Sequence, residues 1–304
     1  MFHSRRVRMI LFLLAVFAGG SAVAQQIAFT WDDLPAHSAL PTGETRVEIG
    51  HKLIAAMKAA GLPPVYGFVN GATIDREPAS APMLKDWRDA GFQLGNHAWS
   101  HMNLNTASSA DWEADVLKNE PVLTQYAAGG DWHWLRYPYT AEGDSAAKRA
   151  EARKFLAAHG YKIAAVTMSF GDYMWNEPYA RCVAKNDAAA LEQLESSYLE
   201  AAAQDVDLRR AMARKLFGHD IPYVLLMHVG AFDARMLPRL LKQYRDEGFT
   251  FVTLEKAEKA AFYKGDVDPS LPDGPDTLEG AMGAKGLAIP APPILSVDLN
   301  NLCR

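Results

Sequence analysis

Short hydrophobic runs of strand-like composition alternate with amphipathic segments of helical period along most of the chain. The apolar runs IAFTW, PVYGFV and FQLGN are each followed by a helical pattern, and the alternation continues through DWHWLRYP, YKIAAVTMS, PYVLLMH and FTFVTL. Strands that alternate with helices indicate βα units with a parallel sheet. The pattern predicts about seven such units.

Glycine residues close several of the predicted helices, and each is followed within a few residues by the next apolar strand: Gly61, Gly91, Gly160 and Gly248. Glycine just past the last helical turn is typical of short helix-to-strand loops. The predicted fold class is therefore α/β, a distorted (β/α)7-type barrel, with an open doubly wound sheet as the alternative. In both architectures the functional side chains lie at the carboxyl ends of the strands.

Three regions depart from this alternation. Residues 1–24 place arginines before an apolar run that ends in small residues, which is typical of a cleaved secretory signal peptide. Residues 25–264 would form the barrel domain, in which 186–218 predict an insertion of one or two long helices, either part of the core or a lid or dimer face. Residues 265–304 are rich in Pro, Gly and Asp and predict an extended tail packed on the barrel.

The signal peptide predicts a periplasmic or secreted protein, with an uncleaved membrane anchor as the alternative. Its apolar run is shorter than the roughly 20 residues that a span needs, so we expect no membrane span after cleavage. The formal net charge of −5 argues against nucleic acid as a partner. Cys182 and Cys303 are the two cysteines, and they would either form a disulfide or remain thiols. The oligomeric state is left open.

Polar side chains stand at the ends of the predicted strands. They are Asp32 and Asp33 after the first, Asn96, His97 and His101 after the third, and Arg136, Asp172 and His228 after the fourth, fifth and sixth. Because the carboxyl ends of parallel strands meet at one edge of a barrel, we expect these side chains to lie together.

His97 and His101 are four residues apart, which on a helical turn would place both imidazoles on one face. With one carboxylate of the aspartate pair they would form a two-His, one-Asp site for Zn²⁺ or another divalent ion. The second carboxylate could then accept a proton from water. The structural alternative is a pair of satisfied histidines and a turn capped by Asp33.

The motifs TWDDLP, HAWSH, RYPY, SFGDYMW and LMH resemble, in their order and strand-end positions, the five motifs of the polysaccharide deacetylases of carbohydrate esterase family 4, the NodB homology domain. The resemblance extends from about Ile27 to His228. It implies a hydrolase that removes N-acetyl or O-acetyl groups from an envelope or extracellular glycan. One divalent ion would be needed, most simply Zn²⁺, with Co²⁺, Ni²⁺ or Mn²⁺ as alternatives.

The resemblance also implies roles for the central motif residues. Asp32 would be the general base, and His228 would be the general acid that protonates the leaving amine. The metal ligands would be Asp33, His97 and His101.

Further roles follow from the remaining motifs. Tyr139 would offer its backbone N–H to the oxyanion, and Arg136 and Asp172 would orient the base and the acid. The wall of the acetyl pocket would include Trp175 and Leu226.

Some positions depart from the family pattern. Leu34 follows Asp33 where glycine is common, and Ala98 follows the first histidine ligand where Ser or Thr is usual. Asn70 ends the second strand and would either reach the site or stabilise an Asn-Gly turn. These departures would permit one functional alternative, a degenerate barrel that binds glycan without turnover. A second alternative follows from the resemblance, because related domains resemble metal-dependent hydrolases of small non-sugar amides.

Overall fold

The computed structural model describes residues 25–271, 277–292 and 294–304, so the predicted signal peptide lies outside the described residues. Seven parallel strands form one curled sheet, in the order β5-β4-β3-β2-β1-β6, and β7 pairs with β1. The strands are β1 (Gln25–Leu34), β2 (Tyr66–Val69), β3 (Gln93–Asn96), β4 (Trp134–Leu135), β5 (Lys162–Ile163), β6 (Tyr223–His228) and β7 (Phe249–Phe251).

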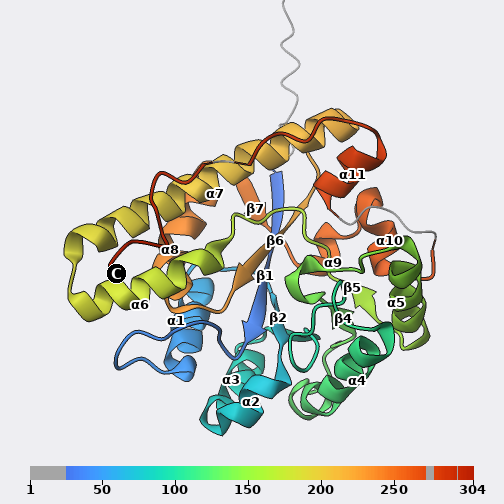
Figure 1. Ribbon diagram of the computed structural model, residues 1–304, viewed down its shortest axis with the longest axis horizontal. Coiled ribbons are helices and arrows are strands. Elements are labelled where there is room, and N and C mark those ends of the chain that lie inside the picture. Colours follow the sequence, from blue (N-terminus) through green and yellow to red (C-terminus); the bar gives the residue numbers. More distant parts are fainter. Residues whose placement is uncertain (1–24, 272–276, 293) are drawn as a thin grey trace, which may run out of the picture.

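The sheet closes on itself through a short contact. A parallel bridge joins Met168, beyond β5, to Leu225 of β6. The backbone N–H of Leu226 donates to the Met168 carbonyl at 3.0 Å. β7 lies beside only the first residues of β1, Gln25 to Ile27. The predicted distorted (β/α) barrel is thereby confirmed, with β1 at its centre (Figure 1).

Helices surround the sheet. The larger ones that follow strands are α1 (Arg46–Ala59), α3 (Pro82–Asp89), α4 (Ser109–Tyr126), α5 (Ala146–Ala158) and α8 (Ala231–Asp246). Shorter elements are α2 (Gly71–Arg76), α9 (Leu254–Ala257), α10 (Lys264–Val267), and the 3₁₀ turns η1 (Pro78–Ser80), η2 (Pro138–Thr140), η3 (Asp172–Trp175) and η4 (Ala261–Tyr263).

Side chains define where several of these helices begin. Thr45 and Glu48 form a capping box at the start of α1, and Ser108 and Ser145 cap α4 and α5. Each cap gives a partner to a backbone N–H that the helix itself leaves unbonded.

The predicted helical insertion forms one helix of 30 residues, α7 (Ala188–Phe217), which packs against the preceding helix α6 (Asn176–Lys185). Asp187 caps its beginning, and Gly218 ends it in the left-handed conformation at φ 79°. Leu194 and Met212 are buried along its inner face. Much of this insertion therefore belongs to the core.

The C-terminal segment returns across α6 and α7 (Figure 1). Its helix α11 (Leu278–Ala284) packs against α7. Cys182 of α6 and Cys303 form a disulfide, with their Cα atoms 5.1 Å apart. Arg181 donates to the carbonyls of Leu299 and Leu302 at 2.9 and 3.0 Å. Of the helices in the described ranges, none is long and apolar enough to cross a membrane.

Candidate active site

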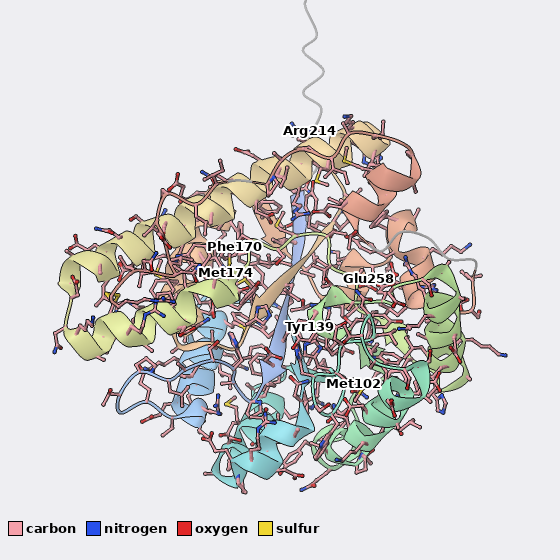
Figure 2. All side chains as sticks on the ribbon, viewed as in Figure 1. Met102, Tyr139, Phe170, Met174, Arg214 and Glu258 are labelled. Carbon is pink, nitrogen blue, oxygen red and sulfur yellow. A yellow bond between two sulfur atoms is a disulfide. The ribbon has the colours of Figure 1, made fainter. Side chains whose placement is uncertain are left out.

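A cavity of about 590 Å³ lies at the carboxyl ends of the strands. The predicted residues among those that line it are Asp32, Asp33, His97, His101, Tyr139, Leu226 and His228. Figure 2 shows Tyr139 on one side of β1 and Met174, just before α6, on the other. Strands far apart in the sequence thus bring their polar ends to one cavity, as expected for a barrel.

Asp33, His97 and His101 form a compact cluster of possible metal ligands. One ligand atom from each lies within 4.8 Å of the others. Asp33 Oδ1 is 3.6 Å from Nε2 of His97 and 3.6 Å from Nε2 of His101. His97 Nδ1 donates to the Arg136 carbonyl at 2.8 Å, which leaves Nε2 unprotonated in the neutral ring. Two imidazole nitrogens and one carboxylate oxygen fit a divalent ion.

A loop, not a helical turn, brings the two histidines together. Ala98 and His101 both have left-handed backbone conformations, with φ 56° and 60°. Asp115 of α4 holds the loop, because its carbonyl accepts from Trp99 N at 3.0 Å and its side chain accepts from Ser100 N at 2.9 Å. The prediction of a helical turn was therefore wrong, although the histidines do converge.

Asn70 braces this loop from the end of β2. Its side-chain amide donates to the carbonyl of His97 at 2.6 Å and to that of Ala98 at 3.0 Å. It also lines a second cavity, which adjoins Asp33 and His101. These two hydrogen bonds hold the backbone of the ligand loop on either side of the His97–Ala98 peptide, where Ala98 itself has no hydroxyl to contribute.

Leu34 packs where the family pattern commonly has glycine. Its side chain is fully buried, and a Cβ placed on Gly67 would lie 1.9 Å from Leu34 Cδ1. The absence of a side chain at Gly67 of β2 therefore makes room for Leu34. Leu34 is thus accommodated in the core beside Asp33, whose own backbone is left-handed at φ 67°.

The two adjacent aspartates have different partners. Asp32 faces Arg136, whose Nη1 donates to Oδ1 at 3.1 Å. Arg136 is buried and is also held by the Ala164 carbonyl and by Thr30 Oγ1, each at 2.8 Å. Burial raises the pKa of Asp33, but the histidine charges around it, His97 first, outweigh burial and lower that pKa overall. Asp32 thus pairs with a permanent cation, whereas Asp33 lies among imidazole rings.

His228 is paired with Asp172. In the pairing of β1 with β6, His228 lies opposite Asp32. Its Nδ1 donates to Asp172 Oδ1 at 2.9 Å, and its backbone N–H donates to Oδ2 at 2.6 Å. Burial alone would lower the pKa of His228, but the charge and hydrogen bond of Asp172 raise it to about 10. The ring is therefore protonated at neutral pH. Because Nδ1 is bonded to Asp172, Nε2 is the ring nitrogen that can donate a proton in the cavity.

His37 is a cavity residue that the sequence did not single out. Its Nδ1 lies 3.9 Å from Asp33 Oδ2, and its ring centroid lies 5.1 Å from that of His228. Burial and the charge of His228 lower its pKa to about 4. His37 comes four residues after Asp33, and this spacing is not typical of a metal site. Only its closeness to Asp33 in the sequence could have suggested that it lines the cavity.

The remaining predicted residues divide between the cavity and the core. Tyr139 has a left-handed backbone at φ 59°, and its ring lies 4.4 Å from that of His101. Leu226 lines the cavity. Trp175 is fully buried and donates from Nε1 to Ser197 Oγ of α7 at 3.0 Å. The structure thus places Trp175 behind the cavity and not among its lining residues.

The family profile of the polysaccharide deacetylases matches residues 19–173, just over half of the chain. The chain belongs to the polysaccharide deacetylase family. It is therefore a hydrolase of the deacetylase class, which acts on amide bonds. No curated protein matches its sequence.

Solved structures of low sequence identity share the fold. A "T48 deacetylase with substrate" is 20% identical, with 78% of this chain and 92% of that chain covered and a TM-score of 0.51. A carbohydrate esterase family 4 pseudoenzyme from Bacillus anthracis is 15% identical, with 77% and 66% covered and a TM-score of 0.54. The chitin deacetylase of the fungal pathogen Colletotrichum lindemuthianum is 20% identical, with 76% and 86% covered and a TM-score of 0.50.

Proposed function

We propose that this deacetylase is metal-dependent and hydrolyses N-acetyl, or O-acetyl, groups of an envelope or extracellular glycan. The observation that carries the proposal is the convergence of Asp33, His97 and His101 in one cavity with two charged pairs, Asp32–Arg136 and Asp172–His228. Zn²⁺ suits this donor set best, and Co²⁺, Ni²⁺ or Mn²⁺ would bind the same atoms.

Asp32 is the proposed general base. A bound ion would polarise the acetyl carbonyl and lower the pKa of water. Asp32 would accept the proton of the attacking water, because it lies beside the cluster, with Oδ2 3.6 Å from His97 Nε2. Arg136 orients this carboxylate through its 3.1 Å hydrogen bond.

His228 is the proposed general acid. Expulsion of an amine from the tetrahedral intermediate requires a proton on nitrogen, and a histidine in its charged form can donate one. Asp172 maintains that form by accepting from Nδ1 at 2.9 Å. The backbone N–H of Tyr139 would stabilise the oxyanion of the intermediate.

The surroundings of the cavity suit a carbohydrate. The aromatic rings of Tyr139 and Tyr173 line it and are 64% and 50% exposed, so they can pack on the apolar face of a sugar. The predicted signal peptide would bring the enzyme to the periplasm or the exterior, where such glycans are found.

The test is acetate release by zinc-loaded protein from three substrates: N-acetylglucosamine oligomers, an O-acetylated polysaccharide and a small non-sugar acetamide. Release from the oligomers is the expected result. Release from the acetamide alone would favour a small-amide hydrolase, and binding of oligomers without any release would favour the degenerate barrel.

A further inference from the structure

The catalytic cavity has a wall that lies outside the part of the chain matched by the family profile. Arg209 of α7, together with Thr277 and Glu279 of the C-terminal segment, lines the same cavity as the metal-ligand cluster. All three lie beyond residues 19–173, the part of the chain that matches the family profile. α7 and α11 pack side by side at the top of the view in Figure 1. The helical insertion and the tail together therefore contribute to the active site.

The guanidinium of Arg209 is held in a fixed orientation in this wall. Its Nε donates to Asp205 Oδ1 at 2.9 Å, its Nη1 donates to Glu279 Oε1, and its Nη2 donates to the Ser169 carbonyl at 3.4 Å. Only 11% of the side chain is exposed. A guanidinium has five N–H groups, so these contacts with the described residues occupy three of them in a side chain that lines the cavity.

Glu279 is the more accessible partner. Its side chain is 40% exposed, and only Oε1 has a protein partner within the described ranges. Its other carboxylate oxygen can accept hydrogen bonds from hydroxyl groups. Because Arg209 is balanced by the carboxylates of Asp205 and Glu279, the wall has no excess positive charge and does not favour an acidic group.

The wall is rigidly attached. Leu278 and Met282 of α11 are fully buried, and Thr277 caps this helix by accepting from Gly280 N at 3.0 Å. Farther along, the disulfide joins the end of the chain to α6. A few polar groups held in fixed positions are typical of binding sites, where they determine the orientation in which a ligand binds.

We propose that Arg209 and Glu279 bind the hydroxyl groups of the neutral sugar unit next to the one that is deacetylated. A cavity of about 590 Å³ is larger than one acetyl group requires and is in the range of drug-sized ligands. Loss of either side chain would then weaken the reaction of an oligomer more than that of a monosaccharide. This inference rests on the proposed deacetylase function.

The test compares kcat/KM for acetate release from N-acetylglucosamine and from its trimer, with zinc-loaded protein. Glu279→Ala should lower the trimer-to-monomer ratio about tenfold, because a hydrogen bond to a charged group is lost. Glu192→Ala, at an exposed position of α7, the helix that carries Arg209, is the matched control and should leave the ratio unchanged.

Arg209→Lys is the second variant, in case Glu279→Ala fails to fold. It keeps the charge but loses the planar fork, so the ratio should fall here too. An unchanged ratio in either folded variant would overturn the inference while leaving the deacetylase function intact. Wild-type protein that binds zinc but releases acetate from neither sugar would refute the proposed function, and this inference with it.

Discussion

The disulfide should contribute a large part of the stability of the molecule. Cys182 and Cys303 are separated by 121 positions in the chain. In the chain-entropy description, a disulfide that closes a loop of this length lowers the entropy of the unfolded chain and so raises its free energy by about 5 kcal/mol at 25 °C. Cys303→Ser should therefore lower the free energy of unfolding by about 3–5 kcal/mol, the lower figure allowing for residual structure in the unfolded chain.

Urea unfolding followed by tryptophan fluorescence measures this difference. The midpoint of thermal unfolding should also fall, by about 10 °C for a chain of this size. Wild-type protein in reductant is the matched control: it should approach the stability of Cys303→Ser, which reductant should not change. Equal unfolding free energies for the variant and the oxidised wild type would refute the reasoning.

Four further substitutions test individual site residues. Asp32→Asn should retain the metal but lower kcat by about 10²–10⁴-fold, because the general base is lost. His97→Ala should lose the metal and the activity together, because a metal ligand is lost. Metal analysis measures the bound ion in each variant, and acetate release measures the activity. Asp172→Asn should lower the pKa of His228 from about 10 toward its ordinary value of 6.5, so the alkaline limb of the kcat/KM profile should move to lower pH. Asn70→Ala removes the brace on the ligand loop and should weaken zinc affinity about 10–100-fold in a chelator competition.

Each of these expectations has a contrary result. Full activity of Asp32→Asn would show that another group is the base. An unmoved alkaline limb in Asp172→Asn would show that His228 does not supply the proton, because a general acid is active only while protonated, below its pKa. Unchanged zinc affinity in Asn70→Ala would show that the loop keeps its geometry without the two hydrogen bonds.

The parallel βα architecture and the polar residues at the strand ends were predictable because both depend on regular patterns. β1 is an apolar run that ends in Asp32 and Asp33, and β6 is one that ends in His228. Parallel strands must then bring these ends together, whatever the intervening loops do. The hydrophobic pattern therefore predicted that the strand ends carrying Asp32, Asp33 and His228 meet at one edge of the sheet.

The loops and the second wall were not predictable in the same way. The left-handed backbone at Ala98 and His101 is imposed by contacts with Asp115 and Asn70, which are distant in sequence. The contribution of Glu279 to the cavity depends on how the tail packs on α7. No local pattern encodes such contacts, and for the same reason the burial of Trp175 behind the cavity was missed.

The central claim is that Asp33, His97 and His101 hold one ion on which deacetylation depends. The most direct test is a titration of Zn²⁺ into chelator-treated protein, with acetate release from N-acetylglucosamine trimer followed at each addition. The account predicts no release before zinc and a linear rise that ends at one ion per chain. Full release from protein verified to be metal-free would contradict it.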